Sequence, residues 1–202
     1  MEKTLNLSGY KCPVLNSSAP GVPIVFLHGL SFTMDVWRDI GVTQLLLEKH
    51  LPFLVLDMPY GLKSRCHPRS RNPEVNLSVV SEAVKSVFAS AVPVFVGASI
   101  GGNIALNYAA RFPVKGLLLV APARALDEDD LVKSYARFNF PVWIIWGTQD
   151  NIVSGEEMRS LAGKVPKAKL LVYEEASHPA YLSQPERFKR DLLELYAHAE
   201  QS

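Results

Sequence analysis

The sequence contains little cysteine, almost no net charge and no long apolar run. Its 202 residues include only Cys12 and Cys66, too few for a disulfide framework, so we expect free thiols in a reducing compartment. The 21 basic and 20 acidic side chains give a net charge of +1, which argues against a nucleic-acid or anionic-membrane partner. The densest basic stretch, from Lys63 to Arg71, is short and is expected to be a solvated loop rather than a phosphate-binding site.

No segment has the composition of a membrane span or a secretory signal. No apolar run approaches the roughly 20 residues that a helix needs to cross a bilayer. The segment from Met1 to Leu7 lacks the apolar core of a signal peptide. We therefore expect a soluble, cytoplasmic protein, and the absence of linkers and repeats predicts a single domain over residues 1–202.

Apolar runs of strand length alternate with segments of helical periodicity. Runs that are apolar on both faces and separated by helices predict an α/β fold with a doubly wound, mostly parallel sheet covered on both sides. Two weaker N-terminal segments are expected to form an antiparallel edge. Strands are expected at residues 4–7, 11–14, 23–27, 53–56, 94–96, 116–120, 142–146 and 169–172. Helices are expected at residues 34–50, 77–91, 100–112 and 156–162, from about residue 127, and at 184–198.

The segment Gly97-Ala98-Ser99-Ile100-Gly101 matches the pattern G-x-S-x-G between a strand and a helix. A strand that turns into a helix within one residue strains the serine backbone and lifts the hydroxyl clear of the sheet. The flanking glycines avoid a collision between a Cβ and the neighbouring elements. This position predicts that Ser99 is a nucleophile. A Gly-rich nucleotide-binding turn, the alternative, is expected after the first strand instead.

A serine hydroxyl needs a base to accept its proton, and five histidines are candidates. His178 follows the last predicted strand, at the same sheet edge as Ser99, whereas the other four have positions typical of solvated or loop residues. Asp150 follows the preceding strand and is the predicted acid. The rival acid, Asp127, belongs to an acidic cluster typical of a helix start. The order serine, aspartate, histidine is the one expected for this kind of sheet.

Two backbone N–H groups are expected to stabilise the oxyanion. One belongs to Ile100, directly after the nucleophile, and the other to Leu30, in the loop that follows the strand 23–27. His28 in the same loop is expected to be structural.

With these residues in place, the chain resembles the α/β-hydrolase superfamily over nearly its whole length. The matching segments are His28-Gly29, residues 57–61, the turn at Ser99, residues 147–150 and residues 177–179. Tyr60 stands where the family's loop pattern has a glycine. About 20 residues separate the strands 116–120 and 142–146, enough for one helix, so the cap domain is expected to be absent or reduced. Size and layout are similar to the abhydrolase-domain-containing 14 group.

This resemblance implies a serine hydrolase that cleaves a small-acyl ester through an acyl-enzyme, with a catalytic triad and no metal or organic cofactor. The expected partner is a small-molecule acyl substrate or an acylated group on a larger partner. Other chemistry on the same triad (a deacetylase, lyase or perhydrolase) and a non-enzymatic interaction protein remain alternatives. Residues near strand ends that could line an acyl pocket, or equally belong to the core, are Phe32, Met34, Trp37, Met58, Tyr60 and Tyr181.

Overall fold

The computed structural model describes residues 2–201 and contains an eight-stranded sheet in the order β1-β2-β4-β3-β5-β6-β7-β8. The first two strands form an antiparallel edge, and β2 pairs antiparallel with β4. All pairs from β4 to β8 are parallel, so their carboxyl ends meet at one edge. The strands are β1 (Glu2–Leu7), β2 (Tyr10–Ser17), β3 (Ile24–Leu27), β4 (Phe53–Leu56), β5 (Val94–Ala98), β6 (Gly116–Val120), β7 (Val142–Gly147) and β8 (Ala168–Tyr173).

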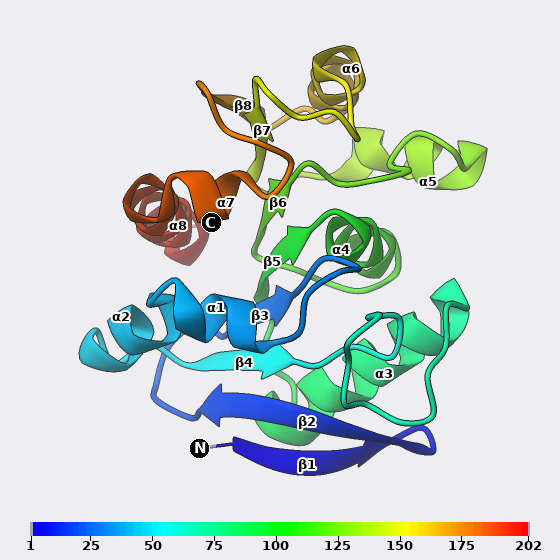
Figure 1. Ribbon diagram of the computed structural model, residues 1–202, viewed down its shortest axis with the longest axis vertical. Coiled ribbons are helices and arrows are strands. Elements are labelled where there is room, and N and C mark those ends of the chain that lie inside the picture. The colour runs from blue at the N-terminus through cyan, green and yellow to red at the C-terminus, as the bar shows by residue number, and fades with distance from the viewer. Residues whose placement is uncertain (1, 202) are drawn as a thin grey trace.

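Helices cover both faces of the sheet, as Figure 1 shows. One face carries α1 (Asp35–Asp39), α2 (Val42–Glu48), α7 (Ala180–Ser183) and α8 (Pro185–Glu200). The opposite face carries α3 (Pro73–Phe88), α4 (Ile100–Arg111), α5 (Asp129–Ser134), the short 3₁₀ helix η1 (Tyr135–Arg137) and α6 (Gly155–Lys164). This is the doubly wound α/β architecture predicted from the alternation of apolar runs.

The two faces of the sheet bury two separate hydrophobic cores. Alternate residues of each strand point to opposite faces, so Val25 and Leu27 enter one core while Ile24 and Phe26 enter the other. All four residues of β3 are fully buried. The apolar character of the central strands on both faces, visible in the sequence, is thus the direct consequence of helices on both sides.

Two helix boundaries differ from the sequence expectation for local reasons. The expected helix 34–50 is divided into α1 and α2 at Gly41, whose φ of +77° is a left-handed conformation that breaks the helical path. The helix expected from residue 77 begins at Pro73, because Asn72 caps it by accepting the N–H of Glu74 at 2.9 Å.

The connection between β6 and β7 is short. In the described chain it holds only α5 and the 3₁₀ helix η1 as regular structure, so the cap is reduced to a small helical segment, as predicted.

The two cysteines are joined in a disulfide, so the expectation of free thiols is wrong. Cys12 lies in β2 and Cys66 in the loop between β4 and α3. Two backbone hydrogen bonds between Lys11 and His67, of 2.7 and 3.0 Å, hold that loop against the strand and bring the cysteine Cα atoms to 4.0 Å. Since 54 residues separate them in sequence, only the fold reveals the contact. The expected cytoplasmic location loses the support that free thiols gave it.

Within residues 2–201, no helix combines the length and the apolar composition that crossing a bilayer requires.

A buried pair, His28 and Asp57, ties the loop after β3 to the loop after β4. Both side chains are fully buried, with His28 Nε2 3.3 Å from Asp57 Oδ1. The Met58 N–H donates to His28 Nε2 at 2.9 Å, and the Arg65 N–H donates to Asp57 Oδ2 at 2.9 Å. The hydroxyl of Tyr60 donates to the His28 carbonyl oxygen. These contacts are those of a structural residue, the role expected of His28.

The environment of Asp57 makes its charge a stabilising feature. Burial raises the pKa of Asp57, but the neighbouring His28 and the Arg65 N–H lower it by more, so the pKa lies below its usual range. The native state therefore binds this proton less tightly than the unfolded chain does. The stabilisation is complete above the unfolded-state pKa of about 3.9 and is lost as the pH falls through the lowered native pKa.

Replacing this carboxylate tests its contribution. Asp57→Asn is expected to lower the free energy of unfolding at pH 7 by about 2 kcal/mol, since a hydrogen bond to a charged acceptor contributes about 1.5–3 kcal/mol. The exposed Asp39→Asn is the matched control, with an expected change below about 0.5 kcal/mol. Urea unfolding between pH 7 and pH 3 measures both. The effect of Asp57→Asn should shrink toward pH 3, and a constant difference would contradict its assignment to charge.

Candidate active site

Ser99 stands at the turn between β5 and α4 in a strained backbone conformation. Its φ of 52° and ψ of −116° lie outside the regions that non-glycine residues normally adopt. The Ser99 N–H donates to the Val120 carbonyl oxygen at 2.8 Å, and its carbonyl oxygen accepts the N–H groups of Gly102 and Asn103. The turn is therefore held by β6 on one side and by the first turn of α4 on the other.

The glycines around Ser99 allow α4 to pack directly against the strand ends. A Cβ on Gly97 would lie 2.6 Å from the Gly101 carbonyl oxygen, and one on Gly101 would lie 2.5 Å from the Leu27 carbonyl oxygen. Such contacts would require backbone to move. The sequence prediction that a side chain at either position collides with neighbouring elements is confirmed.

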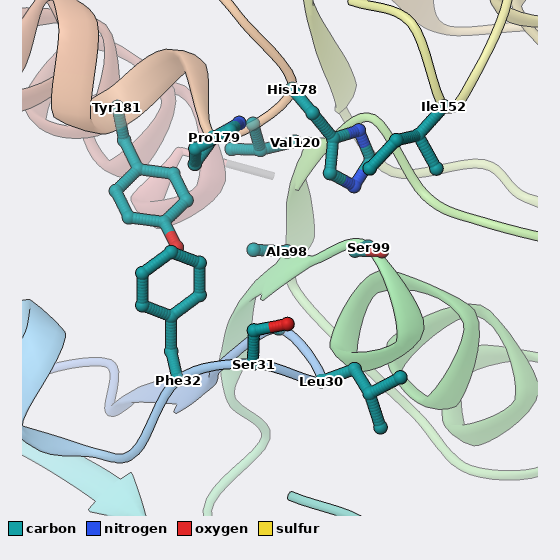
Figure 2. A pocket seen from close by; sticks show the side chains of 11 residues that line it. Leu30, Ser31, Phe32, Ala98, Ser99, Val120, Ile152, His178, Pro179 and Tyr181 are labelled. Carbon is teal, nitrogen blue, oxygen red and sulfur yellow. The ribbon is translucent and has the colours of Figure 1, made fainter. Parts of the chain in front are cut away.

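His178 and Asp150 meet at the same edge of the sheet. Asp150 lies in the loop after β7 and His178 in the loop after β8, and His178 Nδ1 donates to Asp150 Oδ2 at 2.8 Å. The carboxylate is fully buried, and its other oxygen accepts the N–H groups of Ile152 and Val153 at 2.8 and 3.0 Å. Figure 2 shows the imidazole in the same pocket as Ser99, with one ring nitrogen directed toward the serine.

The rival acid has no part in this arrangement. Asp127 forms a surface ion pair with Arg124 at 2.7 Å, and its side chain is about half exposed. Of the five histidines, only His178 lines the pocket that contains Ser99.

The N–H groups predicted for the oxyanion hole lie on both sides of Ser99. Ile100 is the first residue of α4, so its N–H has no acceptor within the helix. Leu30 lines the pocket from the loop after β3, next to Gly29, where a Cβ would lie 3.8 Å from that of Ser99. In residues 2–201, no hydrogen bond outside the regular helices and strands uses the N–H of Leu30 or Ile100. The prediction that these two groups form an oxyanion hole requires that both N–H groups be unpaired in this way.

The pocket around Ser99 has a volume of about 160 Å³. Tyr181 reaches it from α7 and Phe32 from the loop after β3, so two aromatic rings meet at one end, while His178 and Ile152 lie at the other (Figure 2). The remaining lining is largely apolar. All the lining residues are Gly29, Leu30, Ser31, Phe32, Ala98, Ser99, Val120, Ile152, His178, Pro179 and Tyr181.

Four of the six residues considered for the pocket lie in the hydrophobic cores instead, the alternative that the sequence had left open. Trp37 is fully buried between Tyr181 and Phe188, behind the pocket wall. Met58 and Tyr60 point into the core on the opposite face of the sheet. Met34, the sixth candidate, is also core. Proximity to a strand end does not fix the direction of a side chain, because a loop can turn it either toward the edge or under the sheet.

Sequence reasoning missed Ile152 as a lining residue. Its side chain is 67% exposed, two positions after Asp150. A single large apolar residue in the polar loop Gln149-Asp150-Asn151-Ile152 was the available signal, since exposed apolar side chains gather at binding sites. Ser31, Ala98, Val120 and Pro179 carried no comparable signal.

The described part of the chain offers no evident metal site. Among residues 2–201, no three His, Cys, Asp or Glu side chains are grouped so that they could hold an ion.

A family model described as the alpha/beta hydrolase family matches residues 24–141, more than half of the chain. The chain belongs to the α/β-hydrolase family. The matched segment includes Leu30, Ser99 and Ile100 and ends before Asp150 and His178.

Two curated proteins are similar to this α/β-hydrolase over most of its length. The rat protein named "Putative protein-lysine deacylase ABHD14B" is 28% identical over 188 residues, which cover 89% of this chain and 85% of that protein. Human "Protein ABHD14A" is 25% identical over 184 residues, which cover 90% of this chain and 66% of that protein. The chain thus spans just under two thirds of the human relative. These matches confirm the resemblance to the abhydrolase-domain-containing 14 group.

Solved structures share the fold of this α/β-hydrolase at low sequence identity. A predicted CIB-like hydrolase from Thermoplasma acidophilum superimposes with a TM-score of 0.85 at 21% identity, covering 96% of each chain. An esterase from Exiguobacterium antarcticum gives a TM-score of 0.81 at 18% identity, covering 98% of this chain and 100% of its own. At these identities the likeness shows the fold alone.

The hydrogen bond between His178 and Asp150 generates a mutational prediction. In Asp150→Asn, one oxygen can still accept from Ile152 and Val153, but the amide would face the His178 Nδ1–H and favour the wrong tautomer. Hydrolytic turnover is expected to fall by about 10⁴-fold with the fold intact. Steady-state kinetics and circular dichroism measure the two effects. Asp127→Asn is the control. Near-normal activity of Asp150→Asn would contradict the assignment of Asp150 as the acid that orients His178.

Proposed function

We propose that this α/β-hydrolase is a serine hydrolase that cleaves esters of small acyl groups through an acyl-enzyme. The observation that carries the proposal is the 2.8 Å contact of His178 with Asp150 in the pocket that also contains Ser99. The family and its hydrolase members support hydrolysis in general; the residue roles and the ester substrate are our assignment.

The proposed first step is attack by the Ser99 hydroxyl oxygen on the ester carbonyl carbon. His178 Nε2 accepts the hydroxyl proton while Nδ1–H stays bonded to Asp150, whose charge stabilises the imidazolium. When the tetrahedral intermediate collapses, the carbon–oxygen bond to the leaving group breaks and His178 returns the proton to the departing alcohol. Water then attacks the acyl-enzyme with His178 again as base, and this releases the carboxylic acid and the serine.

Two backbone N–H groups would stabilise the negative oxygen of each intermediate. Ile100 donates from the positive end of α4, and Leu30 donates from the loop braced by the buried pair His28 and Asp57. Because the buried pair fixes that loop, the N–H of Leu30 would require little reorganisation during the reaction. Loss of one such donor typically raises the barrier by about 3 kcal/mol.

The size of the pocket favours short acyl groups. Its volume of about 160 Å³ is below the range of roughly 300–1,000 Å³ typical of ligand pockets, and close to a cavity of about 150 Å³ that holds benzene. The aromatic end formed by Phe32 and Tyr181 closes the pocket away from Ser99. A space of this size holds about six non-hydrogen atoms, and the atoms of the ester group take up part of it, which leaves room for an acyl chain of about two to four carbons.

A protein-lysine deacylase is the second candidate. It is favoured by the similarity to the rat protein whose printed name describes that activity, and by the exposed side chains of Leu30 and Ile152 at the pocket mouth. A site with an exposed mouth can accept an acyl group displayed on a large partner. The same nucleophile would attack an amide carbonyl, with His178 protonating the leaving amine.

Covalent labelling tests the nucleophile. A fluorophosphonate probe should form one adduct, at Ser99, and the Ser99→Ala variant should lose it. Ser31→Ala removes the other serine hydroxyl in the pocket and serves as the matched control, with labelling retained. Intact and peptide-level mass spectrometry report the adduct. Folded wild-type protein that does not react would mean that the enzyme interpretation is wrong and would favour a non-enzymatic interaction protein.

The acyl preference is expected to follow the volume of the pocket. Among p-nitrophenyl esters, kcat/KM should be highest between acetate and butyrate and at least about tenfold lower for octanoate, because a longer chain must stay in water or displace core atoms. Phe32→Ala, which opens the aromatic end, should raise the relative rate for hexanoate. Phe112→Ala, a partly exposed aromatic outside the pocket, is the control. Rates that increase steadily with chain length would contradict a closed pocket.

A further inference from the structure

Three exposed cations lie in the loop between β4 and α3 without an acidic partner. They are Lys63, Arg69 and Arg71, and we call them the basic rim. All three are exposed, and among residues 2–201 none of them forms an ion pair. Arg65 in the same loop is different, because it pairs with Glu2 at 3.1 Å. The three cations lie within nine positions of one loop, so this loop carries a local excess of positive charge although the total charge is near zero.

The carboxylates closest to the basic rim in the sequence are already engaged. Asp57 is buried against His28. Glu74 at the start of α3 accepts two hydrogen bonds of 2.6 Å from Arg111 in α4, and this interaction lowers the pKa of Glu74. Neither acid neutralises the three cations.

The basic rim lies next to the mouth of the Ser99 pocket. The Leu62 N–H donates to the carbonyl oxygen of Leu30, a lining residue of that pocket, at 2.9 Å. The guanidinium of Arg69 in turn donates to the Leu62 carbonyl oxygen at 2.8 Å. Figure 1 shows the loop between β4 and α3 beside the loop that follows β3. Leu62 therefore connects the loop that contains Leu30 to Arg69 of the basic rim.

The surface that joins the mouth of the Ser99 pocket to the basic rim is hollowed and partly apolar. Arg69 and Arg71 line a shallow depression of about 160 Å³ together with residues 59–62 and Ser70. Leu30 and Leu62 are 37% and 45% exposed, so two large apolar side chains lead from the pocket mouth to this depression. Exposed apolar side chains beside uncompensated charge are typical of a binding surface rather than of a merely solvated loop.

The orientation of the pocket decides which part of a substrate reaches the basic rim. Phe32 and Tyr181 lie at one end of the pocket, away from Leu30 and Ile152 (Figure 2), whose side chains are 37% and 67% exposed. With the acyl group at the aromatic end, as in the proposed function, the leaving group would extend over the side of Leu30 and Ile152. From there, the neighbouring surface on the Leu30 side is Leu62 and the basic rim.

We propose that the basic rim is a subsite for the leaving-group portion of the substrate, and that this portion is an acidic peptide segment carrying the acyl group on a side chain. This inference rests on the proposed function, because it names the substrate class for that reaction. An extended peptide spans about 3.3 Å per residue, so acidic residues two to four positions from the acylated one reach beyond the pocket mouth. Their carboxylates would meet three cations that form no ion pair within residues 2–201.

Matched peptides test the charge preference. Heptapeptides with blocked termini carry a central O-acetylserine flanked by Asp, Asn or Lys, so the ester that is cleaved is the same in all three. The rate of each peptide's hydrolysis by hydroxide, measured without the protein, corrects kcat/KM for differences in the intrinsic reactivity of the ester. The expected order of kcat/KM is Asp above Asn above Lys, with a ratio of about ten between Asp and Lys at low salt. The ratio should fall toward one near 0.5 M salt, because exposed charges are screened.

Two sets of variants separate a local site from the total charge. Lys63→Gln/Arg69→Gln/Arg71→Gln is expected to reduce the Asp-to-Lys ratio to about one to two. Arg159→Gln/Lys164→Gln/Lys167→Gln removes the same charge from exposed positions at and beyond α6 and should leave the ratio unchanged. The ratio is the readout because it cancels any general loss of activity.

A variant with two substitutions instead of three controls for a folding defect caused by the loss of Arg69. Lys63→Gln/Arg71→Gln retains the contact of Arg69 with Leu62 and should still reduce the ratio at least threefold.

Several outcomes would overturn the proposal. These are a ratio near one in the wild type, an equal reduction in both triple variants, and cleavage of p-nitrophenyl acetate without cleavage of any peptide. In all of them Ser99 still reacts with the fluorophosphonate probe, so the proposed function stands while the subsite fails. If Ser99 does not react and p-nitrophenyl acetate is not cleaved, both proposals fall.

Discussion

The close approach of α4 to the ends of β3 and β5 is the contact on which the candidate site depends. Gly97 and Gly101 leave no room for a Cβ between these elements, which places Ser99 in its strained turn beside the loop that contains Leu30. The strain is held by hydrogen bonds to β6 and to the first turn of α4. A larger residue at either glycine would separate the nucleophile from the groups that are proposed to stabilise the oxyanion.

The parallel direction of the strands is sufficient to bring the other candidate site residues to one edge of the sheet. Because β3, β5, β7 and β8 all point the same way, the loops after them bring Leu30, Ser99, Asp150 and His178 to one edge although they are distant in the sequence. The other side of that edge is braced by the buried pair of His28 and Asp57 and by the disulfide of the following loop.

Much of the fold and the central site residues could be predicted from the sequence, because their signals are local. Apolar runs mark the strands, and G-x-S-x-G between a strand and a helix marks Ser99. Other features depend on conformation that the pattern does not encode. The continuous periodicity of residues 34–50 hides the left-handed Gly41, which ends one helix and begins another. Trp37 and Phe32 look equivalent in the sequence, yet one is core and the other lines the pocket.

By itself, the sequence determined the order of elements, the parallel sheet and the turn at Ser99. It also placed Asp150 and His178 at the same edge as Ser99, since the loops that follow parallel strands all lie at the carboxyl edge. Only the tertiary structure decided which aromatic side chains face the pocket and that Cys12 meets Cys66. It also decided that the basic loop lies beside the pocket mouth. The physical reason is that these contacts join segments far apart in the chain, and their distances depend on how loops fold back over the sheet rather than on any local periodicity.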